Sequence, residues 1–272
     1  MRSNLLEDDV RTVLSEALDS EDGSLTVVNP SRETLSELVS VLDEHEEPPA
    51  VRLLAEDRAL KDEMGDFIVA STAADLVEAD VLELKILEDV PNHSLLIGSE
   101  SVVSLIDAGD AVAGLTSDED AFLDDISSFY DDEWDRADSY SLRTPAMSRV
   151  MDTLESDIGP ETAADFEGVL ASLQTARGDG DGLDEVTISL LVAAKNGELL
   201  YDISKWGEDI GLASKATFSR TKTTLEDMGL IDTEKVPIDV GRPRLRLMLG
   251  DERLQSVDSD ELASVAQGII AS

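Results

Sequence analysis

The sequence predicts an α/β domain with a mixed sheet at the N-terminal end, a helical connector, and a winged helix-turn-helix domain at the C-terminal end. In the first part of the chain, strand patterns alternate with helical patterns. Helical periodicity alone follows, and three short helical patterns then precede a β-hairpin. Glycine and aspartate alternate just before those three helices, which is typical of a linker. The expected divisions are an α/β domain at 1–117, a helical connector at 118–177, a Gly/Asp linker at 178–183, a winged helix-turn-helix at 184–250 and a C-terminal helix at 251–272.

Apolar runs and turn residues predict the order of elements in the α/β domain. A helix is expected over 4–17, and a second helix over 30–44 can be capped by Asn29 with Pro30 in its first position. One or two further helices are expected over 60–77. The expected strands are 24–28, 51–55, 82–87, 95–98, 102–107 and 111–115. The first three strands alternate with helices in a βαβαβ order, and the last three make a hairpin or meander.

The chain is strongly acidic, because 61 Asp and Glu residues against 21 Lys and Arg give a net charge of −40. The carboxylates lie along segments that keep full apolar faces, such as Leu35, Leu38, Val39 and Leu42, so they indicate a folded acidic surface rather than an acidic tail. Near-molar salt screens such a surface, since the Debye length falls to about 3 Å. The composition therefore indicates a halophilic protein, and an acidic partner-binding surface in ordinary salt is the alternative.

The composition also excludes or disfavours several classes of protein. Without cysteine there are no disulfides, thiolate zinc sites or cysteine nucleophiles, and His45 and His93 are the only imidazoles. No P-loop or Gly-x-Ser-x-Gly motif is present, and an EF-hand counted from the aspartates at 179 or 181 lacks glutamate at its twelfth position. No apolar run is long enough to span a membrane, and the N-terminus lacks the pattern of a signal peptide. We therefore expect a cytoplasmic protein that is not an enzyme and holds no cofactor or metal.

Three helices and a hairpin are expected in the 184–250 region. The first helix covers 187–195, with acidic residues at its N-terminus, and the second covers 200–210. The turn Gly211-Leu212-Ala213 follows, and Ser214 can cap a third helix over 215–228 that stops at Gly229. Strands over 230–238 and 244–249 form the hairpin, or wing. Two helices joined by a tight glycine turn are the helix-turn-helix motif.

The charge of this region differs from that of the rest of the chain. Residues 1–183 have a net charge of −34, residues 184–250 have −2, and residues 212–250 reach +2. A basic surface kept within an acidic chain indicates double-stranded DNA as the partner. Arg220 is the strongest base-reading candidate, because the third helix would enter the major groove. The wing arginines are expected at phosphates or in the minor groove, and Lys222 is expected to run along the core edge with its ammonium at the phosphates. The predicted DNA-binding residues are Lys205, Ser214, Lys215, Thr217, Ser219, Arg220, Lys222, Thr223, Arg242, Arg244 and Arg246.

Other interpretations remain open. A winged helix can bind protein without contacting DNA. The α/β domain could bind a small metabolite, with Ser31 and Arg32 at a helix N-terminus as candidates for an anion site, although a plain capped helix explains them equally well. A homodimer is expected, because winged-helix proteins usually read two half-sites. The helices within 141–176 and the segment 262–270 are the candidate dimer interface, and the α/β domain could instead serve only for oligomerisation.

Longer motifs resemble known families. The stretch 202–246 resembles the winged-helix domains of archaeal regulators of the TrmB kind, and the whole chain resembles the haloarchaeal TbsP family of transcriptional regulators. The matching runs are Lys-Ala-Thr-Phe-Ser-Arg-Thr-Lys at 215–222, Gly-Arg-Pro-Arg-Leu-Arg at 241–246, Tyr-Ser-Leu-Arg-Thr-Pro at 140–145, and the segments 67–76 and 175–189. The resemblance implies a sequence-specific DNA-binding regulator of central carbon metabolism genes, acting in the same circuit as the sugar-responsive TrmB.

The segment 93–114 faintly resembles a degenerate phospholipase-D-like strand pair, a fold also found in the sensor half of TrmB relatives. The catalytic form of that fold needs His-x-Lys, whereas His93 is followed by Ser94 and Leu95. The resemblance therefore implies the fold of the α/β domain without its catalytic activity.

Overall fold

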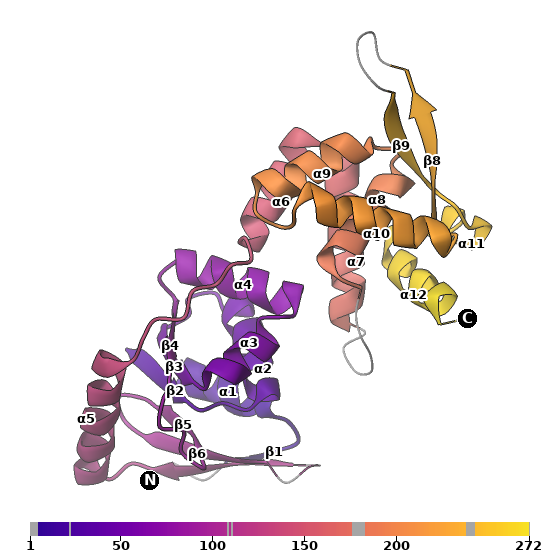
Figure 1. Cartoon of the computed structure of the whole chain (residues 1–272). Helices are drawn as coiled ribbons and strands as arrows, with labels where there is room; N and C mark the ends of the chain where they lie inside the picture. Colours follow the sequence, from indigo (N-terminus) through magenta and orange to yellow (C-terminus); the bar gives the residue numbers. More distant parts are fainter. Residues whose placement is uncertain are drawn as a thin grey trace. The chain divides into compact units, whose positions relative to one another are not determined.

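The computed structural model describes residues 5–21, 23–107, 109, 111–175, 183–237 and 243–271, and it divides the chain into two compact units (Figure 1). The first unit spans Met1–Leu142 and the second Arg143–Ser272. The connector expected over 118–177 is therefore shared: its first helix belongs to the α/β unit, and its other two belong to the second unit. Of the predicted Gly/Asp linker, only Leu183 lies within the described residues.

The first unit contains a seven-stranded mixed sheet in the order β1-β7-β6-β5-β2-β3-β4. Strands β2, β3 and β4 run parallel, as the helices between them in sequence require. Strands β5, β6 and β7 form the expected antiparallel meander, and β5 joins it to β2. The strand bounds are β1 (Leu5–Glu7), β2 (Ser24–Val28), β3 (Ala50–Ala55), β4 (Leu82–Ile86), β5 (Ser94–Ile97), β6 (Val102–Asp107) and β7 (Val112–Ser117).

Helices cover both faces of this sheet. Helices α1 (Val10–Asp19), α2 (Arg32–Glu44), α3 (Asp57–Glu63) and α4 (Phe67–Glu78) contribute to the core on one face. Helix α5 (Asp120–Arg136) contributes to a separate core on the other face, where Tyr130 and Trp134 pack against Val28 and Leu54. These buried contacts make α5 part of the α/β unit rather than of a connector.

Two predictions at the start of this unit were wrong in detail. The helix expected over 4–17 begins only at Val10, capped by Asp9, and the residues before it form β1, which pairs with β7. The pairing is long-range, so the local sequence pattern does not report it. The second helix begins at Arg32 with Ser31 as its cap, because Asn29 has a φ of 47° and its side chain donates to the carbonyl oxygen of Pro91 at 2.8 Å.

The second unit contains the predicted winged helix-turn-helix. Its core elements are α8 (Glu185–Lys195), α9 (Leu200–Asp209), α10 (Lys215–Asp227), β8 (Ile231–Val236) and β9 (Arg244–Leu249). Strands β8 and β9 pair in an antiparallel hairpin, and a bridge between Leu199 and Arg246 adds a short third partner. The flanking helices are α6 (Met147–Asp157), α7 (Pro160–Thr175), α11 (Glu252–Gln255) and α12 (Ser259–Ile270).

Helices α7 and α12 pack closely on each other beside the winged helix. Phe166 of α7 and Leu262 of α12 are fully buried, and a Cβ placed on Gly168 would lie 2.6 Å from the Ser259 Oγ. The two segments expected at a dimer interface therefore bury apolar side chains within one chain. No helix in the described part of the protein is long and apolar enough to cross a membrane.

Candidate nucleic-acid interface

Helices α9 and α10 form the helix-turn-helix, and local sequence signals set the turn between them. Gly211 has a φ of 85°, a conformation that glycine adopts without the steric cost of a Cβ. Ser214 caps α10, because its Oγ accepts the backbone N–H of Thr217 at 3.2 Å. Trp206 of α9 and Phe218 of α10 are buried, so they fix the position of α10 against the rest of the unit.

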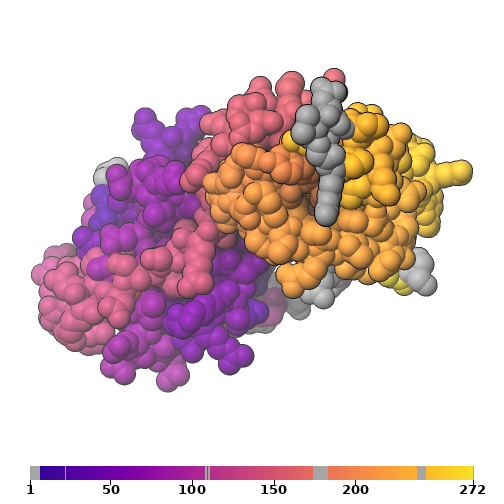
Figure 2. Space-filling model, turned by 45° about the horizontal axis from the view of Figure 1, so that its top comes forward, coloured from indigo at the N-terminus to yellow at the C-terminus, as the bar shows by residue number. Residues whose placement is uncertain are grey.

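The outer face of α10 exposes a short polar surface. Ser219, Arg220 and Thr223 are exposed, and the exposed sides of α9 and α10 form part of the orange surface in Figure 2. No carboxylate among the described residues pairs with the Arg220 guanidinium. Ser214 and Thr217, two other predicted contacts, have their hydroxyl oxygens 3.0 Å apart and serve the helix cap. The face that remains free for a ligand is therefore centred on Arg220.

Two of the predicted lysines are held by carboxylates. Lys205 bonds Asp209 one turn later in α9, and Lys215 bonds Glu208 across the turn. Glu208 also accepts the backbone N–H of Lys215 at 3.3 Å. The side-chain hydrogen bonds lower the pKa of both carboxyls and raise the pKa of both lysines. All four groups therefore stay charged across the neutral range.

Lys222 belongs to a hydrogen-bonded group that links α10 to the wing through Glu226. Its side chain is only 12% exposed, and its Nζ lies 2.6 Å from a carboxylate oxygen of Glu226. The other oxygen of Glu226 accepts the hydroxyl of Thr233 in β8 at 2.7 Å. Burial raises the pKa of Glu226, but the bonds from Lys222 and Thr233 outweigh it, and the net pKa is lowered. The side chain is thus largely buried, and its ammonium is engaged by Glu226.

Substituting Lys222→Met is expected to lower the free energy of unfolding by about 1 kcal/mol, because Glu226 loses a charge-assisted hydrogen bond while the apolar stem is kept. Urea denaturation would measure this. The difference from wild type should be present above the unfolded glutamate pKa of about 4.3 and should disappear as the pH falls through the lowered folded value, because Glu226 is then protonated in both proteins.

Lys61→Met provides the control for that substitution, because Lys61 makes an exposed pair with Asp57 four residues away. A smaller loss, about 0.3–0.5 kcal/mol, is expected there. A Lys222→Met protein with unchanged stability and weakened DNA binding would instead assign the ammonium to phosphate contact.

The base of the wing is joined to the N-terminal part of α9. Arg244 donates to Asp202 at 3.1 Å, and its guanidinium carbon lies 4.2 Å from the centre of the Tyr201 ring. Arg246 is exposed on the same face of β9. The backbone N–H of Leu247 donates to the carbonyl oxygen of Glu198 at 2.8 Å. These contacts fix the base of the wing, so Arg244 and Arg246 extend from a strand that is held in place.

Three predicted binding residues remain, namely Arg242 in the wing and Ser31 and Arg32 in the α/β unit. Arg242 lies outside the described residues. In the α/β unit, Ser31 accepts the backbone N–H of Thr34 at 3.1 Å, and Arg32 pairs with Asp62, so both have partners within the protein. This geometry is that of a capped helix.

Sequence reasoning left two residues out of the interface. Lys235 is exposed and lies two residues beyond Thr233 on the same face of β8, the face that turns toward α10. The alternation of side chains along the wing strand is the sequence signal that could have assigned Lys235 to this face. Tyr201, which lies under Arg244, had no such signal, because the two residues are far apart in sequence.

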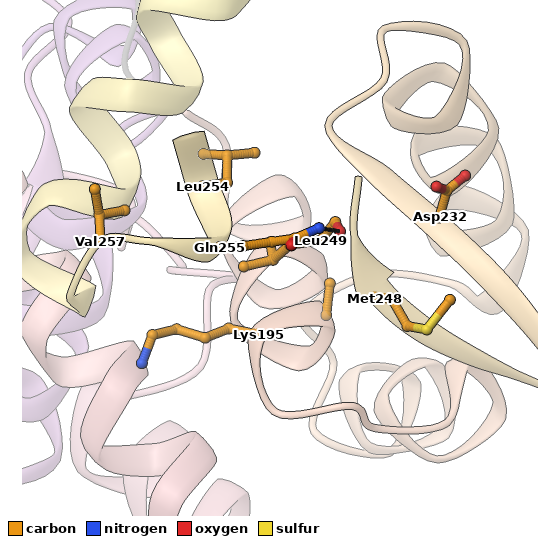
Figure 3. A pocket seen from close by; sticks show the side chains of 8 residues that line it. Lys195, Asp232, Met248, Leu249, Leu254, Gln255 and Val257 are labelled. Carbon is orange, nitrogen blue, oxygen red and sulfur yellow. Dashed lines mark hydrogen bonds between the residues drawn. The ribbon is translucent and has the colours of Figure 1, made fainter. Parts of the chain in front are cut away.

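A cavity of about 440 Å³ lies near the base of the wing, between α8, β9 and α11 (Figure 3). The polar side chains that line this cavity do not point toward a common centre (Figure 3). Lys195 is bonded to both carboxylate oxygens of Asp165 at 2.8 and 2.9 Å, and Gln255 donates to the carbonyl oxygen of Leu249. The polar groups of this cavity are therefore largely engaged by the protein itself.

Comparison with known proteins agrees with this architecture. Residues 2–145 match the family described as "Transcriptional regulator TbsP-like, N-terminal", and residues 146–267 match "Transcriptional regulator TbsP-like, C-terminal HTH domain". The boundary between the two matches falls close to the boundary between the two structural units. No curated protein matches the chain.

Among solved structures, the chain is similar to TrmBL2, described as an archaeal chromatin protein with a novel mode of DNA binding, at 12% identity and a TM-score of 0.37. That match covers 51% of this chain and 54% of TrmBL2. It is also similar to Nuc, a phospholipase D family member from Salmonella typhimurium, at 13% identity and a TM-score of 0.38, over 51% of this chain and 97% of Nuc. The two family matches, which together span residues 2–267, show that the chain belongs to the TbsP-like transcriptional regulators.

Proposed function

We propose that this protein regulates transcription by binding specific sequences in double-stranded DNA through α10 and the wing. The main support is the exposed face of α10, where Arg220 stands beside Ser219 and Thr223 without a carboxylate partner among the described residues. A guanidinium in this position can donate two hydrogen bonds to the O6 and N7 atoms of guanine in the major groove. The neighbouring hydroxyls can bond several bases or phosphates.

The wing would supply contacts that depend less on sequence. Arg244 and Arg246 project from one face of β9, and Arg242 is the remaining wing candidate. Arginines on a wing usually bind phosphates or enter the minor groove, so they fix the register of the protein on the duplex. Lys235 would add a further cation on the side that faces α10.

The biological setting is part of the same proposal. The strong acidity of the chain supports a halophilic archaeal source, and the family resemblance supports control of central carbon metabolism genes in the cytoplasm. A homodimer would read two half-sites. A small metabolite bound by the α/β unit would make the protein responsive to carbon supply, although the described residues near Ser31 and Arg32 are satisfied internally.

Selection from a duplex library with a randomised core, carried out with the full-length protein in molar potassium chloride, tests DNA binding directly. Enrichment of a defined motif is expected. Chromatin immunoprecipitation with sequencing in two carbon sources would then show whether the same motif marks a fixed set of promoters. If the library yields no motif and no promoter is enriched, the winged helix is a protein-interaction module and the proposal is wrong.

A further inference from the structure

Two carboxylates of the interface, Glu208 and Asp209, occupy positions in α9 that helix stability does not favour. Glu208 and Asp209 are exposed in the last turn of α9. The partial negative charge at a helix C-terminus disfavours acidic side chains there. Lys205 lies four residues before Asp209, which is the less favourable order for such a pair. Helix stability therefore does not explain why these two residues are acidic.

Glu208 occupies a place suited to a DNA phosphate. Its carboxylate accepts both the backbone N–H and the ammonium of Lys215, at the first turn of α10. Backbone N–H groups at a helix N-terminus bind phosphate well, and helix-turn-helix proteins contact the DNA backbone there. A phosphate that reaches Lys215 must therefore displace Glu208.

The same arrangement occurs at two other cations. Asp209 holds Lys205, and Asp202 holds Arg244. Arg220, in contrast, has no carboxylate partner in the described part of the chain. Three cations suited to phosphate contact are thus paired within the protein, whereas Arg220, and Lys235 and Arg246 in the wing, have no carboxylate partner among the described residues.

We propose that Glu208 and Asp209 are specificity-determining residues that suppress binding to the DNA backbone alone. Each competes with a phosphate for one lysine, so at these two positions docking on an arbitrary sequence exchanges one ion pair for another and gains little affinity. A DNA sequence with a base that accepts hydrogen bonds from Arg220 gains this base contact in addition. This inference rests on the proposed function and adds to it the source of discrimination between specific and arbitrary DNA.

The test compares the full-length wild-type protein with Glu208→Gln, Asp209→Asn and the double variant on two duplex probes. One probe is the randomised library, and the other is the pool enriched by selection with wild type. Binding to the randomised library should tighten about two- to fivefold for each substitution, because a lysine becomes available to phosphate. The enriched pool should gain less, so the ratio of the two affinities should fall. The slope of log affinity against log salt on the randomised library should become more negative by about 0.9 for each lysine that gains a phosphate.

Asp57→Asn is the matched control. Asp57 pairs with Lys61 four residues away in α3, so the substitution removes the same charge from a similar exposed pair in the other unit. If Glu208→Gln and Asp209→Asn alter binding to the randomised library no more than Asp57→Asn does, or tighten binding to both probes equally, the two carboxylates do not set specificity. A wild-type protein that enriches no motif would instead overturn the proposed function itself, which separates the two failures.

Discussion

Replacing Arg220 with alanine is expected to weaken binding to the DNA selected by the wild-type protein by about 1–3 kcal/mol, roughly 5- to 150-fold in Kd. Binding to a randomised library should change little, because the lost contact reads a base and not the backbone. The side chain is exposed and has no carboxylate partner among the described residues, so thermal stability should stay near that of wild type. Fluorescence anisotropy on both probes in molar salt measures the two affinities.

Two further variants isolate the role of the guanidinium. Arg220→Lys keeps the positive charge but cannot donate two parallel hydrogen bonds to guanine, so it should also lose selective binding. Arg58→Ala removes one positive charge from an exposed site in α3 and should leave both affinities unchanged. Equal losses on selected and randomised DNA for Arg220→Ala would show that Arg220 contacts phosphate, and the base-reading assignment would then be wrong.

The helix-turn-helix could be predicted from the sequence because its signals are local. Gly211 marks the left-handed turn, Ser214 caps the next helix, and Phe218 and Leu225 face inward seven residues apart. The strict alternation of 244–249 similarly predicted the wing strand. Each of these features depends on neighbours a few residues away, so a single sequence reports them well.

Features that depend on distant parts of the chain could not be predicted in the same way. Strand β1 is a strand because β7 lies beside it, and α5 belongs to the α/β unit because Tyr130 and Trp134 meet the sheet. At the interface, the spacing of Lys205 and Asp209 permits a pair, but the contact of Arg244 with Tyr201 requires the wing to fold back onto α9. Composition predicted a basic surface, whereas the structure shows that several of its cations are already neutralised.

The close packing of α9 against α10 leads to the second prediction of a large effect, a loss of stability on substitution of Gly207. A Cβ placed on Gly207 would lie 2.4 Å from the Cε2 atom and 2.5 Å from the Cζ atom of Phe218, far inside the usual contact distance of about 3.5–4.0 Å. The Phe218 side chain is fully buried, and protein interiors are close-packed, so the ring cannot shift without moving its neighbours. Alanine normally stabilises a helix by about 1 kcal/mol relative to glycine, so a glycine here reflects the packing and not helix propensity.

Gly207→Ala is therefore expected to reduce the free energy of unfolding by about 1–3 kcal/mol and to speed hydrogen exchange in α9 and α10. DNA binding should fall as well, because α10 can no longer hold its position against α9. Gly268→Ala in α12 is the control: a Cβ there meets nothing within 4 Å, and the change should be neutral or stabilising. The double variant Gly207→Ala with Phe218→Leu should lose less stability than the two single losses combined, since the smaller side chain relieves the clash. A Gly207→Ala protein as stable as wild type would show that the two helices can separate at no cost, and Phe218 would then not fix the recognition helix.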